Sequence, residues 1–292
     1  MANLSVIIIT HNEEKNIGRC IRSVEAIADE VIVMDSFSQD RTTQLATELG
    51  AKCYYRAFSG YGDQKNAAAR MATHDHLLFL DADEYLSDEL KDSISQEKKR
   101  GFPHDGYRMK RLSYYCERWI RHSSWYPDRK LRLIQRGKGG WNTELVHESM
   151  EPIKGASLAT LQGDLLHLPY ANQENHLAKI NRYSTLAAKR MHLQGKKPSL
   201  FKILFSPVSS FFSGYVLHAG FLDGLPGFMI AIHSAYYTFL KYAKLRQLNY
   251  TIIVPAGYTS PQKTPPHRQH SPDPEYRVLP TQKPYGSQYR RI

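Results

Sequence analysis

The sequence predicts an α/β fold in which a mostly parallel sheet carries helices on both faces and is followed by a helical region. Over the first hundred residues, short apolar segments of strand length alternate with segments whose apolar residues recur at helical spacing. From residue 171 onward, amphipathic and uncharged segments of helical length replace this alternation. Acidic or polar side chains follow several of the predicted strands, at the sheet edge where open α/β folds bind their ligands.

The first strand and the first helix are the clearest elements. Leu4–Thr10 is a continuous run rich in β-branched residues, which is typical of a strand buried on both faces. Asn12–Ala28 places apolar residues at helical spacing. We expect Glu13 and Glu14 in the first turn of this helix, where the helix dipole favours negative charge.

The same alternation continues to about residue 94. Because strands that alternate with helices run parallel, we expect these strands in one sheet. The expected strands are Val31–Met34, Lys52–Arg56 and His76–Leu80; the expected helices run from Asp40, as N-cap, to Gly50, over Gln64–Ala72 and over Ser87–Ile94.

The next segment is less regular. Gly106–Glu151 is aromatic and basic, with short strands expected near Tyr107–Leu112 and Lys130–Gln135. We interpret residues 1–170 as one domain with two halves, 1–100 and 101–170.

Residues 171–248 are predicted to form helices that associate with a membrane. His176–Met191 is amphipathic, and two long uncharged stretches follow, Ile203–Leu222 and Gly224–Leu240. Basic residues at the outer ends of the stretches favour a re-entrant hairpin or interfacial helices on an anionic leaflet. A buried helical subdomain and a true two-span protein are the alternatives. Residues 249–292 are rich in proline and basic residues, which predicts a flexible tail.

Composition narrows the partners and the compartment. The chain has 292 residues and a formal net charge of +11, which attracts polyanions such as nucleic acid, anionic lipid or sugar phosphates. Without a recognised nucleic-acid module, we expect no nucleic-acid partner. Three cysteines, none in a C-x-x-C pair, argue against a disulfide framework. The first residues lack a secretory signal, so we expect the protein in the cytoplasm or on its membrane.

The strongest chemical signal is an apolar strand that ends in three carboxylates, Asp81, Asp83 and Glu84. If the backbone turns at the strand end, Asp81 and Asp83 converge on one hard cation. Mg²⁺ or Mn²⁺ held by one or two carboxylates takes its remaining ligands from diphosphate oxygens and water. The alternative is that these carboxylates only favour the N-terminus of the helix after them.

Two other strand tips carry polar residues that suit a nucleotide. Asp35 follows the second strand and could accept a hydrogen bond from a base or ribose; Thr10, Asn12 and Glu13 end the first strand. No glycine-rich phosphate loop occurs, so a metal and basic side chains must bind phosphate instead. The candidates at a predicted helix N-terminus are Gln64, Lys65, Asn66 and Arg70. For Lys65 and Arg70 the alternative is a solvated helix face.

Together these segments resemble the family 2 glycosyltransferases of GT-A fold. The resemblance rests on VIIITHNEE at 6–14, VIVMDSFSQDRT at 31–42 and FLDADE at 79–84. More narrowly, the chain resembles the bacterial lipopolysaccharide-core β-1,4-glucosyltransferase group over about 4–248. The later residues that agree are Lys130–Leu133 before Val146–Glu148, His167 with Tyr170, Lys179 with Arg182 and Tyr183, and Gly220–Gly224 with Gly227.

The resemblance implies roles for these residues. Asp35 would contact the base, Asp83 the metal, and Asp81 the ribose or the water shell of the metal. His147 or His167 would complete the metal shell. The donor implied is UDP-glucose, with UDP-galactose, UDP-N-acetylhexosamine and a nucleotide-heptose as open alternatives. The acceptor implied is a lipid-linked glycan at the cytoplasmic face of the inner membrane, where the protein would be peripheral or monotopic.

An inverting transfer also needs a carboxylate near the acceptor hydroxyl, to take its proton as it attacks the anomeric carbon. Glu148 is the first candidate and Glu144 the second. Trp125 and Trp141 could stack on acceptor sugar rings, although core packing is the alternative for each.

Two other functions remain open at this point: a metal-dependent nucleotidyl- or phospho-transferase acting on a membrane phosphate, and a non-catalytic basic protein that binds membranes or RNA. The sequence does not predict the oligomeric state.

Overall fold

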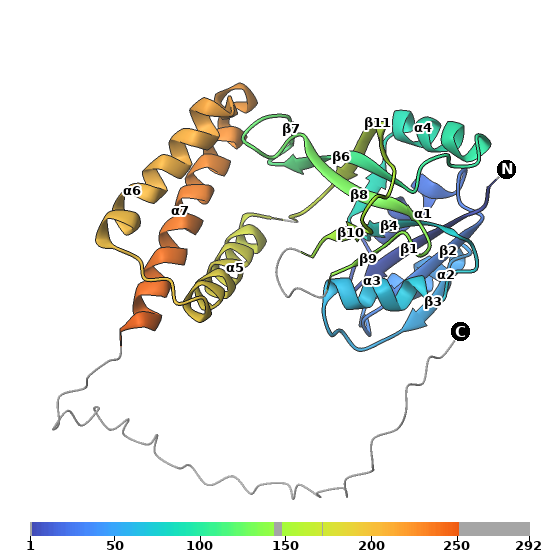
Figure 1. Cartoon of the computed structure of the whole chain (residues 1–292), viewed down its shortest axis with the longest axis horizontal. Coiled ribbons are helices and arrows are strands. Elements are labelled where there is room, and N and C mark those ends of the chain that lie inside the picture. The colour runs from blue at the N-terminus through green and yellow to red at the C-terminus, as the bar shows by residue number, and fades with distance from the viewer. Residues whose placement is uncertain (1, 143–147, 171, 251–292) are drawn as a thin grey trace, which may run out of the picture.

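The computed structural model describes residues 2–142, 148–170 and 172–250. Within them, a nine-stranded sheet with helices on its faces is followed by a layer formed by α5, α6 and α7 (Figure 1). The α/β class expected from the sequence is therefore confirmed. The predicted tail lies, beyond residue 250, outside the described residues.

The sheet has the strand order β3-β2-β1-β4-β8-β6-β11-β5, and β7 pairs with β6. A separate two-stranded sheet joins β10 and β9. The strands are β1 Leu4–Thr10, β2 Glu30–Asp35, β3 Lys52–Tyr55, β4 His76–Asp81, β5 Glu84–Leu86, β6 Gly106–Tyr115, β7 Arg118–Ile120, β8 Asp128–Gln135, β9 Gly139–Trp141, β10 Met150–Pro152 and β11 Leu158–His167. The helices are α1 Ile17–Val24, α2 Thr42–Glu48, α3 Tyr61–Ala69, α4 Asp88–Lys99, α5 Gln173–Leu193, α6 Leu200–Phe212 and α7 Gly224–Asn249, with short turns η1 Ser213–Leu217 and η2 Gly220–Asp223 between the last two.

The first half of the sheet is parallel, as predicted. Strand β1 pairs with β2 and β4, and β2 pairs with β3. The register places Thr10 beside Asp35 and Ile9 beside Asp81. The carboxyl ends of three predicted strands therefore meet at one edge of the sheet.

Alternation along β1 divides the core between two faces. Leu4, Val6 and Ile8 pack with residues of α1, α2 and α4 on one face. Ile7 and Ile9 pack with residues of α3 and with Trp141 and Met150 of the small sheet on the other. The structure thus covers both faces of β1, and all seven of its residues are buried.

The second half departs from a parallel sheet. Strand β8 runs antiparallel to both β4 and β6, whereas β11 runs parallel to β6 and antiparallel to β5. Strands β5 and β11 were not expected from the sequence. Both depend on pairing between residues far apart in the chain, which local apolar patterns do not reveal.

Several predicted helix starts were wrong: α3 begins at Tyr61, so Gln64 lies inside the helix and not at its N-terminus, and α5 begins at Gln173 and not at His176. Helix α1 begins at Ile17, so Glu13 and Glu14 precede it instead of forming its first turn. The segment before it is a turn in which Asn12 has φ of 55° and the Glu13 N–H donates to Thr42 Oγ1. Arg41, not Asp40, occupies the N-cap position of α2, and Asp40 accepts hydrogen bonds from Thr42.

The first of the two uncharged stretches does not form one continuous helix. It forms α6, η1 and η2, and Ala219, between the two turns, has φ of 52°. Gly227 of α7 lies against η2, and a Cβ at this position would lie 1.9 Å from the carbonyl oxygen of Gly220. Helix α7 can thus pack closely against η2.

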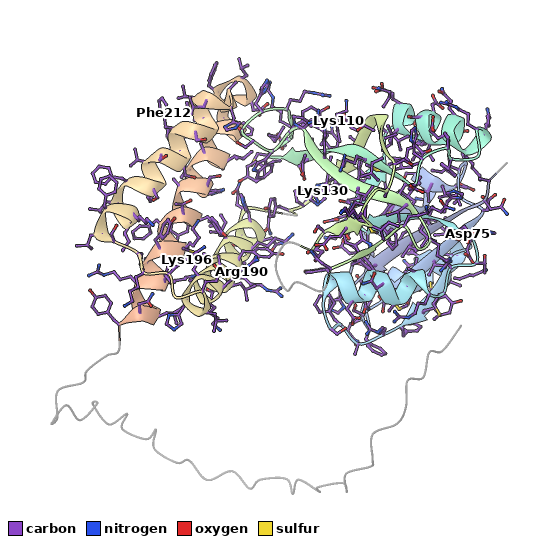
Figure 2. All side chains as sticks on the ribbon, in the orientation of Figure 1. Asp75, Lys110, Lys130, Arg190, Lys196 and Phe212 are labelled. Atoms are coloured by element: carbon purple, nitrogen blue, oxygen red, sulfur yellow. The ribbon has the colours of Figure 1, made fainter. Side chains whose placement is uncertain are left out.

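The layer of helices α5, α6 and α7 leaves much apolar surface exposed. Helix α7 packs against both α5 and α6. Within the described residues, Leu200–Leu217 is the one segment long and apolar enough to cross a membrane, and 6% of it is buried. Phe212 lies on the side of α6 that faces away from the sheet, and 51% of it is exposed (Figure 2).

Candidate functional site

A cavity of about 450 Å³ opens at the edge where the parallel strands end. The tips of β1 and β4, helix α3, the end of β11 and helix α5 all contribute to its wall. The predicted site residues that line it are Thr10, Glu13, Gln64, Asp81, Asp83, Glu148 and His167.

Asp83 and His167 form a pair suited to a divalent cation. His167 Nε2 lies 3.5 Å from Asp83 Oδ2, and its Nδ1 lies 3.1 Å from Ser113 Oγ. The pair is positioned by backbone contacts, because the Leu168 N–H donates to the Asp83 carbonyl. One carboxylate oxygen and one imidazole nitrogen are donors that Mn²⁺ accepts.

Metal ligation at this pair would need further donors. Within the described residues, no group of three or more His, Cys, Asp or Glu side chains could hold a metal ion. Phosphate oxygens and water would therefore supply the rest, as is usual for Mg²⁺-type sites. The predicted ligand His147 and the second candidate base Glu144 lie outside the described residues.

Asp81 takes part in an ion-pair network with two buried cations. Lys65 Nζ lies 2.8 Å from Asp81 Oδ1, and Arg132 donates to Oδ2 over 3.0 Å. Burial raises the pKa of Asp81, but the charges of Lys65 and Arg132 outweigh it and hold that pKa well below its ordinary value. Asp81 is therefore a fixed negative charge whose oxygens both face cations.

Lys65 is 1% exposed and does not line the cavity itself, but contacts Asp81 in its wall. Its Nζ also lies 3.8 Å from Glu148 Oε1 and 4.2 Å from the centre of the Trp141 ring. The Arg132 guanidinium lies over the same ring, at 5.3 Å. Trp141, predicted to stack on a sugar, is 7% exposed and mainly supports these two cations.

Glu84, the third carboxylate of the strand end, is fully buried and does not line the cavity. Its Oε1 accepts from Arg132 over 2.7 Å and from Arg111 over 3.3 Å, and its Oε2 accepts from the Asp81 N–H. Glu84 thus fixes the backbone turn after β4. Sequence reasoning gave no role to Arg132 or Arg111, although an arginine between two leucines of a strand is a signal for a buried ion pair.

Glu13 lines the same cavity. Burial raises the pKa of its carboxyl, Asn16 partly offsets this by donating to it, and the charge of Asp83 adds to the rise. Thr10, beside it, has a buried Oγ1 without a hydrogen-bond partner within the described residues.

The remaining predicted nucleotide-binding residues mostly hold the loops around the cavity. Buried Asp35 accepts from the Ser38 N–H and Oγ, and Asn12 Oδ1 accepts from the Gln39 N–H. Gln64 Nε2 donates to Ser36 Oγ, and Ser36 lines the cavity. Asn66 exchanges two hydrogen bonds with the Trp141 backbone, whereas Arg70 is exposed at the end of α3.

A second cavity, of about 620 Å³, adjoins the first. The residues that line both are Tyr61, Asp81, Glu148, Tyr170 and Tyr183. The second cavity adds a basic wall from β6 and β8, and Trp141 and Met150 also line it. Glu148 therefore stands where the two cavities meet.

Trp125 lies away from both of these cavities. It packs against Tyr115 and Ile230 and lines a third cavity, of about 570 Å³, beside α5 and α7. Two histidines meet there, His176 and His233, with their Nδ1 atoms 3.0 Å apart. Burial lowers the pKa of His176 to about 4, with the charge of His233 adding to the effect.

Comparison with known proteins decides the family. The model of the family described as "Glycosyl transferase family 2" matches residues 5–150. A glycosyltransferase of Rickettsia bellii is 35% identical over 259 residues, which cover 84% of this chain and 87% of the relative. The lipopolysaccharide core biosynthesis glycosyltransferase LpsC of Rhizobium meliloti is 32% identical over 250 residues, or 84% and 92% of the two chains.

The chain belongs to glycosyl transferase family 2. Its fold is similar to that of the mannosyltransferase PcManGT from Pyrobaculum calidifontis, solved in complex with GDP-Man and Mn²⁺. The TM-score is 0.51 at 18% identity, over 85% of this chain and 88% of that one. This likeness concerns the fold alone.

Family membership gives the two cavities a chemical context. A glycosyltransferase must hold a sugar donor and an acceptor side by side, with a group between them that can move a proton. Family membership also favours sugar transfer over nucleotidyl or phosphoryl transfer and over non-catalytic binding of membranes or RNA.

Proposed function

We propose that this glycosyltransferase transfers a hexose, namely glucose from UDP-glucose, to a hydroxyl of a lipopolysaccharide-core or other lipid-linked glycan. The transfer would invert the configuration of the anomeric carbon. The first cavity would bind the nucleotide-diphosphate sugar, and the second the acceptor. The position of Glu148 carries this proposal, because its side chain lines both cavities and is 25% exposed.

During the transfer, one proton moves from the acceptor to a side chain of this protein. The acceptor oxygen attacks the anomeric carbon, the bond from that carbon to the diphosphate breaks, and the Glu148 carboxylate takes the proton of the hydroxyl. Asp81 would face the ribose or the water shell of the metal, its charge held by Lys65 and Arg132. A general base contributes about 10²–10⁴-fold to the rate.

Asp83 and His167 would hold Mn²⁺ or Mg²⁺ in the first cavity. When bound, such an ion stabilises the negative charge that develops on the diphosphate as it leaves. The 3.5 Å separation of His167 Nε2 from Asp83 Oδ2, with His167 Nδ1 beside Ser113 Oγ, supports this assignment.

The apolar surface of α6 and α7 would place the enzyme at the cytoplasmic face of the inner membrane, as a peripheral or monotopic protein. The exposure of side chains such as Leu204, at 63%, and Val208, at 64%, supports this location, as does Lys202 in the first turn of α6. A relative that takes part in lipopolysaccharide core biosynthesis supports the same location.

The proposal is tested by offering a panel of nucleotide sugars with purified lipopolysaccharide and measuring the nucleotide product. Release of a nucleoside diphosphate from UDP-glucose is expected. Release of pyrophosphate instead, or turnover of no nucleotide sugar, would refute it.

The role of Glu148 is tested with Glu148→Gln, which should lower kcat by roughly 10²–10⁴-fold without loss of donor binding. Glu151→Gln is the matched control, because Glu151 is an exposed carboxylate three residues further on whose Oε1 accepts from Asn142. Equal rates in the two variants would remove Glu148 from the base role.

A further inference from the structure

The second cavity has a strongly basic wall. Two carboxylates line it, Asp81 and Glu148, against five cations within the described residues: Arg108, Arg111, Arg129, Lys130 and Arg132. The cations come from the neighbouring antiparallel strands β6 and β8, on which Figure 2 labels Lys110 and Lys130.

Three of the five cations are neutralised by the protein itself. Arg111 pairs with Glu84 and Asp128, at 3.3 and 2.8 Å. Arg132 pairs with Asp81 and Glu84, at 3.0 and 2.7 Å. Lys130 lies 3.1 Å from Asp128.

The other two cations, Arg108 and Arg129, make no hydrogen bond or ion pair with any residue that the structure describes. The register pairs Arg108 with Leu131 and Lys110 with Arg129, so the two arginines occupy diagonal positions on adjacent strands. Side chains at such positions are within reach of a common ligand.

Arg132 provides a second, independent observation. It lines this cavity and is 3% exposed, yet its Nε and Nη1 atoms have no hydrogen-bond partner within the described residues. Buried donors are normally satisfied, and leaving one without a partner costs about 1–3 kcal/mol. An anion in the cavity is the kind of ligand that would satisfy such a donor.

The shape of the guanidinium group specifies the ligand chemistry. Arginine binds phosphate and carboxylate groups through two parallel N–H···O bonds, which are shorter and stronger than hydrogen bonds between neutral groups. We propose that the second cavity selects acceptors that carry a phosphate or carboxylate substituent, which Arg108 and Arg129 bind beside the hydroxyl that is glycosylated. This inference rests on the proposed function of the two cavities.

The diphosphate of the donor is a less suitable occupant. Asp83 and His167, the pair suited to a cation, line the first cavity and not the second. The experiment therefore measures donor and acceptor separately.

The test uses the full-length enzyme and three preparations of lipopolysaccharide: untreated, dephosphorylated with aqueous hydrofluoric acid, and carboxyl-reduced. With the double variant Arg108→Gln/Arg129→Gln, the KM for untreated acceptor should rise roughly tenfold or more, while the KM for the nucleotide sugar stays unchanged. One of the two treatments should raise the KM of the wild-type enzyme similarly and remove its sensitivity to the double variant. That treatment identifies the anion.

Lys110→Gln is the matched control, since Lys110 lies on β6 between the lining residues but does not line the cavity itself. It should leave both KM values unchanged. The thermal unfolding midpoint of the double variant should equal that of the wild type, because both arginines are exposed.

Three results would overturn the inference: equal KM values for all three acceptors, an equal effect of the double variant on each, or a rise in the donor KM alone. In each case transfer still occurs, so the proposed function would survive. Failure to turn over any nucleotide sugar would instead remove the proposed function.

Discussion

At the scale of single residues, Asp83 and His167 carry the prediction about the metal. Asp83→Asn keeps the volume of the side chain but removes the negative charge that would attract a divalent cation. We expect kcat to fall by about 100-fold or more, because a bound cation supplies several kcal/mol of charge stabilisation.

The same loss is expected when EDTA is added to the wild-type enzyme, with recovery on addition of Mn²⁺ or Mg²⁺. Asp88→Asn serves as the control, because Asp88 is an exposed carboxylate at the start of α4 that pairs with Lys91. Full activity under chelation would remove the metal from the mechanism.

The position of a site residue could be predicted from the sequence only where a local pattern, such as the end of a strand, determines it. Asp81, Asp83 and Glu13 follow strand ends, and the parallel register brings those ends together, so the sequence pattern sufficed. The pairing of Arg132 with Asp81 requires β8 to lie antiparallel beside β4. That contact joins residues 51 positions apart, and no local pattern encodes it.

At the scale of elements, the contact between α3 and β9 positions Lys65 and Trp141. Gly62 of α3 allows this contact, because a Cβ there would lie 1.9 Å from the Asn142 carbonyl oxygen. In an exposed helix, Gly→Ala would stabilise by about 1 kcal/mol. Here the overlap with backbone should dominate, and Gly62→Ala should destabilise the protein by about 1–3 kcal/mol.

Urea unfolding measures this change, with Gly140→Ala of β9 as the control. A Cβ on Gly140 would lie 3.9 Å from its nearest neighbour, Asn66 Oδ1, so that variant should unfold like the wild type. A stabilised Gly62→Ala variant would contradict the close approach of α3 to β9.

Prediction of elements succeeded where periodicity is strong and failed where turns compete with helices. Strand β1 was predicted to the residue, since its seven residues are all buried. The residues after it keep helical spacing, but Asn12 and Glu13 bond to Ser38 and Thr42. These contacts with the loop after β2 and with the first residue of α2 hold the chain in a turn, so that α1 begins only at Ile17. The spacing of apolar residues does not reveal such contacts.

At the scale of the whole molecule, the apolar surface of α6 and α7 is expected to bind vesicles that contain anionic lipid. The double variant Leu204→Gln/Val208→Gln should lower the fraction that sediments with vesicles by more than tenfold, since burying each side chain contributes about 1.5–3 kcal/mol. Both side chains are largely exposed, so folding should be unaffected.

Leu193→Gln is the control for this measurement. Leu193 is 87% exposed but lies at the end of α5, outside the surface of α6 and α7. Unchanged sedimentation of the double variant would mean that this surface contacts something other than lipid.

Helix α5 lies between the sheet and the pair of helices α6 and α7 (Figure 1). Its Lys179 and Tyr183 line the first cavity, and the same helix packs against α7. If α7 rests on lipid, the distance from the bilayer surface to Glu148 is set by the width of one helix packed on another, about 8–10 Å between their axes, plus the depth of the cavity. The enzyme would then glycosylate only those sugars of a membrane-anchored glycan that lie at this distance from the bilayer surface.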